Sequence, residues 1–226
     1  MPVTSSPVDE IIARVPGAPL LMAQRAFIDS LRAFQTISQS WEASPDSIAQ
    51  VAGNTAQYDI TYNAVDSEPF DLLFTQLPRK EPMAATTREF YRNRAEAPNI
   101  LSDTTVYSLI SFGPNVARIQ LMKDPGADKS ADLRITMALR QTYDTAGVNP
   151  FAHSITDPHF SSYREEVILG AAGRLLMLPN RVWTNIDLGT GLVKLAKTRA
   201  EEWSTIRPDG GARTTSRNAV GGYGGY

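Results

Sequence analysis

Two amphipathic segments near the C-terminus decide the fold. Residues 158–178 read PHFSSYREEVILGAAGRLLML, and residues 186–204 read IDLGTGLVKLAKTRAEEWS. Apolar residues of the first segment recur at three- and four-residue steps, which places them on one helix face. They are Phe160, Tyr163, Val167, Ala171, Leu175 and Leu178. Asp157-Pro158 predicts the helix start, with aspartate as the cap and proline at the first helical position, and Pro179 predicts its end.

The second segment predicts a second helix with an apolar face of its own. That face contains Leu188, Leu192, Leu195, Arg199 and Trp203. Gly170 and Gly173 lie inside the first helix, where a glycine costs about 1 kcal/mol relative to alanine. We therefore expect these small residues to let another helix approach closely. No catalytic motif interrupts either helix, so the pair is interpreted as an assembly scaffold.

The composition describes a foldable chain with little net charge. The chain has 226 residues, 42% of them hydrophobic and 20% charged, and a formal net charge of -2. This length allows one domain of mixed structure, or one domain with another inserted. The charge argues against a protein that coats nucleic acid, because phosphates select a basic surface. The absence of cysteine excludes disulfides, zinc–thiolate sites and cysteine nucleophiles.

The sequence carries no recognisable signal for export or membrane insertion. Its N-terminus has neither a basic nor an apolar signal-peptide region, and no run approaches the ~18 apolar residues that span a bilayer. We expect a soluble protein that is made in the cytosol.

The chain before the C-terminal helices predicts one more long helix and an antiparallel sheet. The helix runs from about Pro19 to Trp41, because Phe27, Leu31 and Phe34 share a face with that tryptophan. Alternating apolar and polar residues then predict strands, and the tight turns between them favour antiparallel pairing with one buried face. The strands are expected at residues 58–62, 70–77, 104–112, 116–123 and 133–139.

The expected fold class is therefore α+β. It is a helical bundle of one N-terminal and two C-terminal long helices, with an inserted antiparallel β region and extended arms. Residues 1–56 hold the N-terminal segment and the first helix, and residues 57–142 hold the β region with its long arm. Residues 143–204 hold the C-terminal helices, and residues 205–226 form a flexible tail.

Two connections, residues 43–56 and 78–103, are long for a compact domain, and such segments are usually functional or mobile. The second carries mixed charges, which favours a protein partner over nucleic acid. Its arginines form a candidate inter-subunit arm: Arg79, Arg88, Arg92 and Arg94. The tail either stays disordered or orders on a partner, with Tyr223 and Tyr226 as aromatic anchors.

No motif for catalysis or metal binding is recognisable. His153 and His159 straddle an expected loop and helix start, so nothing enforces the spacing of metal ligands. Gly189-Thr190-Gly191 follows no strand and lacks the third glycine of a dinucleotide fold, so it is interpreted as the start of a helix. The sequence has no Walker A motif, nucleophile elbow or His-Glu-x-x-His. We expect no enzyme activity, no cofactor and no metal.

A family resemblance connects these features. The turn Pro16-Gly17-Ala18-Pro19 leads into a helix that ends near Trp41. The strand at 133–139 follows, and then the helix at 160–178 with Trp183 just after it. This order resembles the head-to-tail adaptor proteins of tailed phages, the short-tailed phages in particular.

The resemblance implies a homo-oligomeric ring, commonly of about twelve copies, between the portal protein and a tail or nozzle protein. It implies that the C-terminal segment clasps the portal, and that DNA passes through the lumen without specific binding. The portal contacts would be Arg207, Arg213, Arg217, Tyr223 and Tyr226. The protein would reside in the neck of the virion, and in the host cytoplasm during assembly. Alternatives are a tail terminator, a fibre-docking protein and a virion-associated enzyme.

Overall fold

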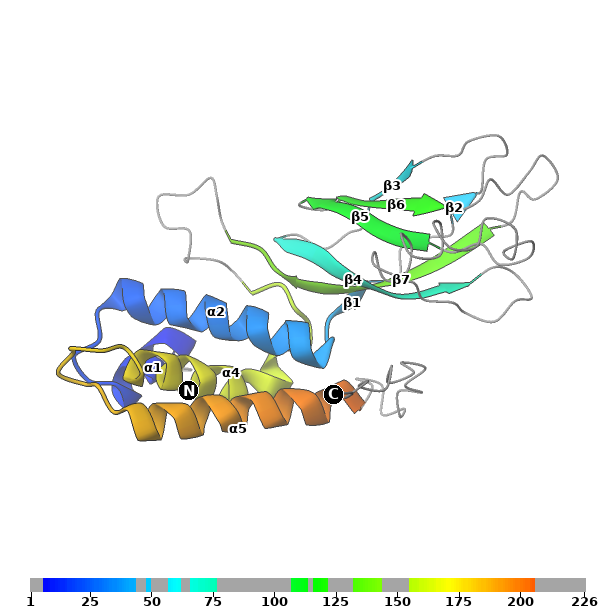
Figure 1. Ribbon diagram of the computed structural model, residues 1–226. Coiled ribbons are helices and arrows are strands. Elements are labelled where there is room, and N and C mark those ends of the chain that lie inside the picture. Colours follow the sequence, from blue (N-terminus) through cyan, green and yellow to red (C-terminus); the bar gives the residue numbers. More distant parts are fainter. Residues whose placement is uncertain are drawn as a thin grey trace, which may run out of the picture.

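Helices and strands occupy separate parts of the computed structural model. It describes residues 6–43, 48–49, 57–61, 66–76, 107–113, 116–121, 132–143 and 155–205. The helices α1 (Pro7–Arg14), α2 (Leu20–Ser38), α4 (Phe160–Leu176) and α5 (Ile186–Thr205) lie together and are called the helical layer (Figure 1). The strands lie beside one end of α2, and they come between α2 and α4 in the sequence. The α+β class is confirmed.

α1 is a helix that the sequence reading missed. Ser6 caps it by accepting a hydrogen bond from the Asp9 backbone N–H at 3.2 Å, and Pro7 occupies the first turn. The negative charges of two acidic residues in that turn interact favourably with the positive end of the helix dipole. Ile11 is fully buried and anchors α1 on the rest of the layer.

α2 supplies one wall of the core, on the face that the sequence predicted. Phe27, Leu31 and Phe34 are buried, and the Phe34 ring stacks on Tyr163 with centroids 4.4 Å apart. The helix ends at Ser38, three residues earlier than expected, because Gln39 adopts a left-handed conformation. Trp41 lies beyond the helix and is still buried.

The start of α4 differs from the prediction. The helix begins at Phe160, and Asp157 does not cap it. The Asp157 carboxylate instead accepts bonds from the His159 backbone N–H at 2.8 Å and from the Tyr163 hydroxyl. An aspartate that bonds the N–H two residues later forms a turn in competition with a helical cap. The Asp157 side chain is therefore buried and hydrogen-bonded in the core.

The apolar face predicted for α5 is also wrong in part. Leu188 and Leu195 are 51% and 43% exposed. Leu192 and Trp203 pack against the core as predicted, and the same side of α5 also contains the buried small residues Gly189 and Ala200. A Cβ on Gly173 would lie 2.8 Å from the carbonyl oxygen of Gly189, so the two backbones nearly touch. This confirms the expectation that the α4 glycines let another helix approach closely.

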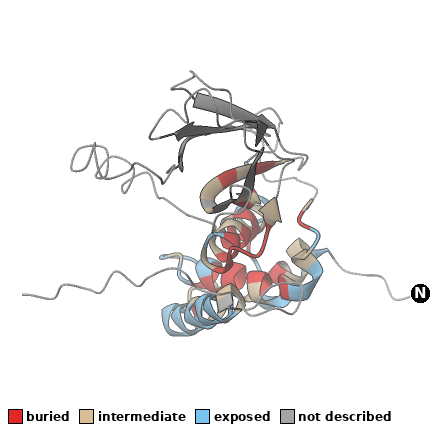
Figure 2. Ribbon diagram, turned by 90° about the vertical axis from the view of Figure 1, so that its right-hand side faces the viewer, coloured by how far each residue is buried: buried red, intermediate tan, exposed pale blue. Residues whose placement is uncertain are grey.

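α4 is the central helix of the layer. α1, α2 and α5 all contact it, and its buried residues face all three. Buried residues gather where the helices meet, whereas α5 has a largely exposed outer side (Figure 2). Within the described residues, no helix is long and apolar enough to cross a membrane.

The strands form two antiparallel sheets. In the first, β7 (Asp132–Gln141) pairs with β1 (Glu42–Ala43), β2 (Ile48–Ala49) and β4 (Ser67–Gln76). In the second, β6 (Val116–Leu121) lies between β3 (Gln57–Thr61) and β5 (Tyr107–Gly113). All the strands expected from alternation are present, with antiparallel pairing. A single sheet was expected, however, and β1 and β2 are too short to show alternation.

An ionic joint of Arg32, Glu68 and Arg140 connects α2 to β4 and β7. Arg32 Nη2 and Arg140 Nε donate to the same oxygen, Oε1 of Glu68, at 2.8 and 2.7 Å. Arg32 also donates to the carbonyl oxygen of Gln141. These side chains are mostly buried, so the ionic joint fixes the helical layer against the first sheet.

A buried polar network lies beside the ionic joint. The Gln35 amide donates to Asp157 Oδ2 at 2.9 Å, and its carbonyl oxygen accepts from the Gln141 backbone N–H at 2.8 Å. The Tyr163 hydroxyl donates to the same Asp157 carboxylate. The last turn of α2, the start of α4 with the residues before it, and the end of β7 thus share one set of hydrogen bonds.

Candidate protein-interaction site

The site residues nominated from the sequence lie outside the described residues. This applies to the arm arginines Arg79, Arg88, Arg92 and Arg94, and to the tail residues Arg207, Arg213, Arg217, Tyr223 and Tyr226. Of the two histidines, His153 also lies outside, and His159 immediately precedes α4. The candidate site in the described part of the chain consists of other residues.

Exposed apolar side chains gather at one end of the helical layer. They come from the start of α2 and from the connection between α4 and α5, which meet at the same end in Figure 1. Leu20 and Leu21 are 55% and 61% exposed, and Val182 is fully exposed. We call this set the apolar end: Leu20, Leu21, Met177, Val182 and Ile186.

The loop that presents Val182 is tied down by hydrogen bonds. The Thr184 hydroxyl donates to the Leu178 carbonyl oxygen at 2.6 Å and accepts from the Arg181 backbone N–H at 3.0 Å. Asn185 N–H donates to the Leu176 carbonyl oxygen at 2.9 Å. Asn180 takes the left-handed conformation, which asparagine tolerates better than most residues. Val182 is thus held outward by a closed loop.

Trp183 fastens this loop to the turn between α1 and α2. Its ring lies 3.7 Å from the place that a Cβ would occupy on Gly17, a glycine with φ of 90°. The indole N–H is buried, and no acceptor for it lies among the described residues. The tryptophan covers core while its neighbour Val182 remains uncovered.

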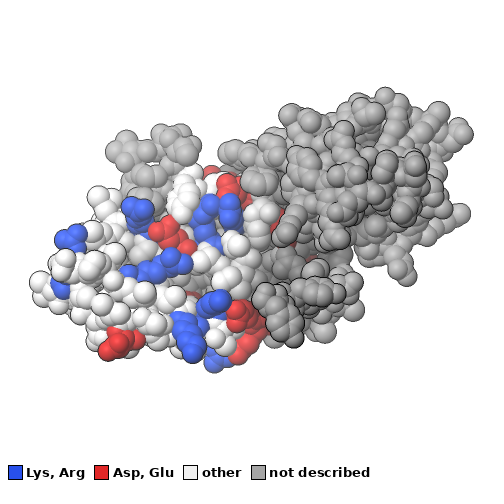
Figure 3. Space-filling model, in the orientation of Figure 1, with Lys and Arg blue, Asp and Glu red and all other residues white. Residues whose placement is uncertain are grey.

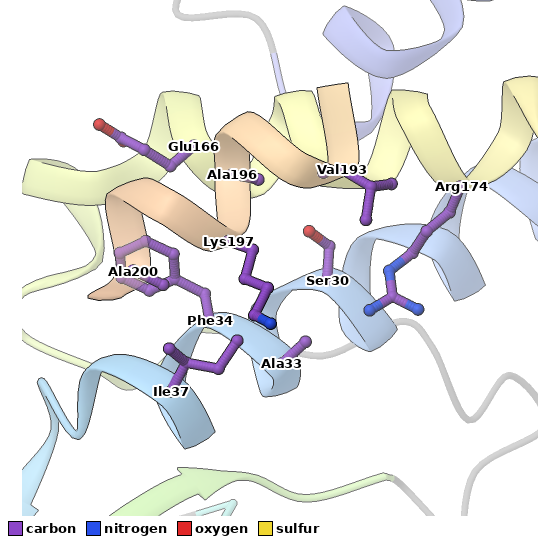
Figure 4. A pocket seen from close by; sticks show the side chains of 11 residues that line it. Ser30, Ala33, Phe34, Ile37, Glu166, Arg174, Val193, Ala196, Lys197 and Ala200 are labelled. Carbon is purple, nitrogen blue, oxygen red and sulfur yellow. The ribbon is translucent and has the colours of Figure 1, made fainter. Parts of the chain in front are cut away.

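A small pocket opens on the side of the helical layer, between α2, α4 and α5 (Figure 4). Its volume is about 120 Å³, below the usual range of small-molecule sites. The lining is mainly apolar and includes Ala33, Phe34, Ile37, Val193, Ala196 and Ala200. Gly170 forms part of the wall, where a Cβ would come within 2.4 Å of Ser30 Oγ. The close packing of small residues shapes this cavity.

Charged side chains border the pocket. Arg174 and Lys197 point into the space between α5 and α2, whereas the Glu166 carboxylate points away from it (Figure 4). Lys197 Nζ also lies 3.7 Å from Oε1 of Glu201, and Arg174 forms no ion pair within the described residues. Over the helical layer, positive and negative groups are interspersed on the face in Figure 3. That face is not a single-sign groove of the kind that attracts phosphates.

The described residues do not assemble a catalytic site. No group of three His, Cys, Asp or Glu side chains in them is placed to hold a metal ion. The pocket lining has no histidine and no carboxylate directed at its serine, whose hydroxyl donates to the Val167 carbonyl oxygen at 2.8 Å. Burial, then the charge and hydrogen bond of Asp157, raise the pKa of Tyr163, so that its phenol stays neutral.

Sequence reasoning missed both the apolar end and the pocket. One signal was present: Val182 and Trp183 are apolar residues in a turn that follows Pro179-Asn180. Which of the two is covered depends on the packing against Gly17, and periodicity carries no information on that.

No protein-family model matches this sequence, and no curated protein matches it significantly.

Proposed function

We propose that the protein is a structural component of a phage virion, a head-to-tail adaptor that forms a ring between the portal and the tail. The apolar end carries this proposal. Several large apolar side chains exposed at one end of a molecule form a candidate surface for contact with another protein. Here the exposed residues sit on a hydrogen-bonded loop and a helix start. A rigid apolar surface of this kind suits repeated docking in an assembly.

The α+β architecture is compatible with such a role. In the proposed ring, a helical bundle is the rigid part, and an inserted β region and extended arms reach neighbouring proteins. Arg79, Arg88, Arg92 and Arg94 would contact adjacent copies. Arg207, Arg213, Arg217, Tyr223 and Tyr226 would contact the portal, and many short tails acting together would give avidity. DNA would pass through the ring without specific contacts, because the chain has a net charge of -2.

Mixing with the portal ring of the same genome tests this function. We expect light scattering or mass photometry to show the portal peak gaining about a ring's worth of this chain. Deleting residues 206–226 should abolish the gain, while thermal unfolding stays unchanged because the deletion begins after α5.

The Leu20→Ser/Leu21→Ser variant provides the second arm of this test. Both side chains are more than half exposed, so we expect stability to change by less than about 0.5 kcal/mol while docking is lost. If the tail deletion and the Leu20→Ser/Leu21→Ser variant both bind the portal as well as the original protein does, the proposal that these surfaces contact the portal is contradicted. Absence of any association would instead point to another neck or tail component, such as a tail terminator.

A further inference from the structure

We propose that Val182 of one copy inserts into the side pocket of the next copy, and that this contact joins subunits head to tail. The inference deepens the proposed function, because it names the residues that would close the ring. Its occupant is a second copy of this chain.

The two surfaces are complementary in shape. Val182 is fully exposed on a loop that is closed by the Thr184 and Asn185 hydrogen bonds. The pocket is an apolar cavity of about 120 Å³, with a size suited to one aliphatic side chain and too small for most metabolites. A rigid projecting side chain loses little conformational freedom when it binds, which favours association.

The charges around the two surfaces also match. Asp187 is exposed in the first turn of α5, shortly after Val182, and Arg181 precedes Val182. The pocket presents Arg174 and Lys197 inward, whereas the Glu166 carboxylate points away from it. The Asp187 carboxylate of a docked copy can therefore meet Arg174. Neither Asp187 nor Arg174 has an ion-pair partner within the described part of the chain.

The positions of the two surfaces decide the symmetry of the contact. The connection between α4 and α5, which contains Val182, lies at one end of the helical layer (Figure 1), whereas the pocket lies on its side, between α2, α4 and α5 (Figure 4). A contact that each pair of copies makes once, between two different patches, is heterologous, and it produces a ring when the rotation closes and an open filament when it does not. A closed ring is the outcome that the proposed adaptor requires, whereas reciprocal insertion of two Val182 side chains would give a twofold dimer.

Cysteine cross-linking tests the contact directly, because the chain has no cysteine of its own. We would mix two single variants, Val182→Cys and Ala33→Cys, alone and with the portal ring, under mild oxidation. Any disulfide between the two variants joins different molecules. We expect at least tenfold more of this product than from Val182→Cys mixed with Thr198→Cys, a control on the exposed side of α5. If the Val182→Cys/Ala33→Cys mixture and the Val182→Cys/Thr198→Cys mixture give equal yields of cross-linked product, the inference is overturned.

A charge exchange provides an independent measurement. Asp187→Arg and Arg174→Asp should each reduce assembly on the portal at least tenfold, and the double variant should restore it. Single variants with normal assembly, or a double variant without recovery, would overturn the inference. Portal binding without the specific disulfide rejects this contact and leaves the adaptor function standing. The disulfide without portal binding retains the contact and rejects the adaptor function.

Discussion

Tyr163 is fully buried, and its hydroxyl is committed to the carboxylate of Asp157. Burial and the neighbouring carboxylate raise the pKa of this tyrosine above its ordinary value of 10.0. In the unfolded chain the phenol loses its proton at about pH 10, whereas in the folded chain it keeps it. The folded state therefore binds more protons above that pH, and its stability must fall as the pH rises.

We predict that Tyr163→Phe lowers the free energy of unfolding at pH 7 by about 1–3 kcal/mol, because Asp157 loses a buried donor. The same variant should lose stability less steeply between pH 9 and 11, a range set by the ordinary tyrosine pKa near 10. Urea unfolding at several pH values measures both effects. Tyr143→Phe is the comparison variant: burial and Asp29 raise the pKa of that tyrosine too, but its side chain is 39% exposed, so we expect a smaller change in the alkaline slope. An unchanged alkaline slope for Tyr163→Phe would refute this assignment.

At the scale of elements, the contact between α4 and α5 depends on glycine. A Cβ on Gly173 would meet the Gly189 carbonyl oxygen at 2.8 Å and Val193 Cγ2 at 2.9 Å, closer than real Cβ contacts occur. Gly191 lies on α5, two residues after Gly189, and a Cβ added to it would lie in open space. An alanine at Gly173 tests the close packing of the helices, whereas an alanine at Gly191 tests only the helix propensity of the residue.

Gly173→Ala should destabilise the protein by about 1–3 kcal/mol, because the helices must move apart. Gly191→Ala should stabilise it by about 0.5–1 kcal/mol, because alanine restricts the unfolded chain and favours the helix. Thermal or urea unfolding of the two variants measures the difference in sign. Equal effects at both positions would mean that the close approach of the helices is wrong.

The same elements show which parts of the fold could be predicted. The aromatic stripe on α2 coincides with its buried face, and the alternation in β7 predicts a strand, so both elements were correctly expected. In β7, Ala138 is as buried as Met137 and Leu139 on the opposite face. α5 misled the prediction because leucines normally mark the buried side of a helix. Its buried side is chosen by Gly173 and Gly189, whose small size lets the backbones approach. Periodicity counts apolar residues and gives no weight to a missing side chain.

At the scale of the whole molecule, the ionic joint holds the helical layer to the first sheet. Glu68 is the shared acceptor of Arg32 and Arg140, and its side chain is only 23% exposed. Arg14 and Glu165 form a second ion pair at 2.6 Å, but Glu165 is 55% exposed. Water already competes for the second pair, so the two should differ strongly in their contribution.

We predict that Glu68→Gln costs about 1–3 kcal/mol, because two largely buried guanidinium groups lose their anion. Glu165→Gln should cost no more than about 0.5 kcal/mol, in line with exposed pairs. Salt should weaken the Glu165 contribution further and leave the Glu68 contribution nearly unchanged. Urea unfolding of both variants at low and high ionic strength gives the comparison, and a larger loss for Glu165→Gln would contradict it.

The candidate site could not be predicted at any scale from sequence alone. The nominated arginines and tyrosines were chosen for their residue type in long polar segments, and they lie outside the described residues. Val182 became a candidate only because packing leaves it uncovered beside Trp183, which is partly buried against the core. The pocket likewise forms where α2 packs against α4 and α5, which are more than 120 residues away in the sequence. Both features arise from tertiary contacts.

The central position of α4 has a consequence for synthesis on the ribosome. The buried face of α2 is complete once Ser38 has been made, yet its partner α4 begins at Phe160. At ordinary translation rates the intervening chain takes roughly 6–24 s. During that interval Phe27, Leu31 and Phe34 have no α4 to pack against. Newly made chains should therefore engage chaperones at this stretch, and slower translation of the strand region should lower the yield of folded protein.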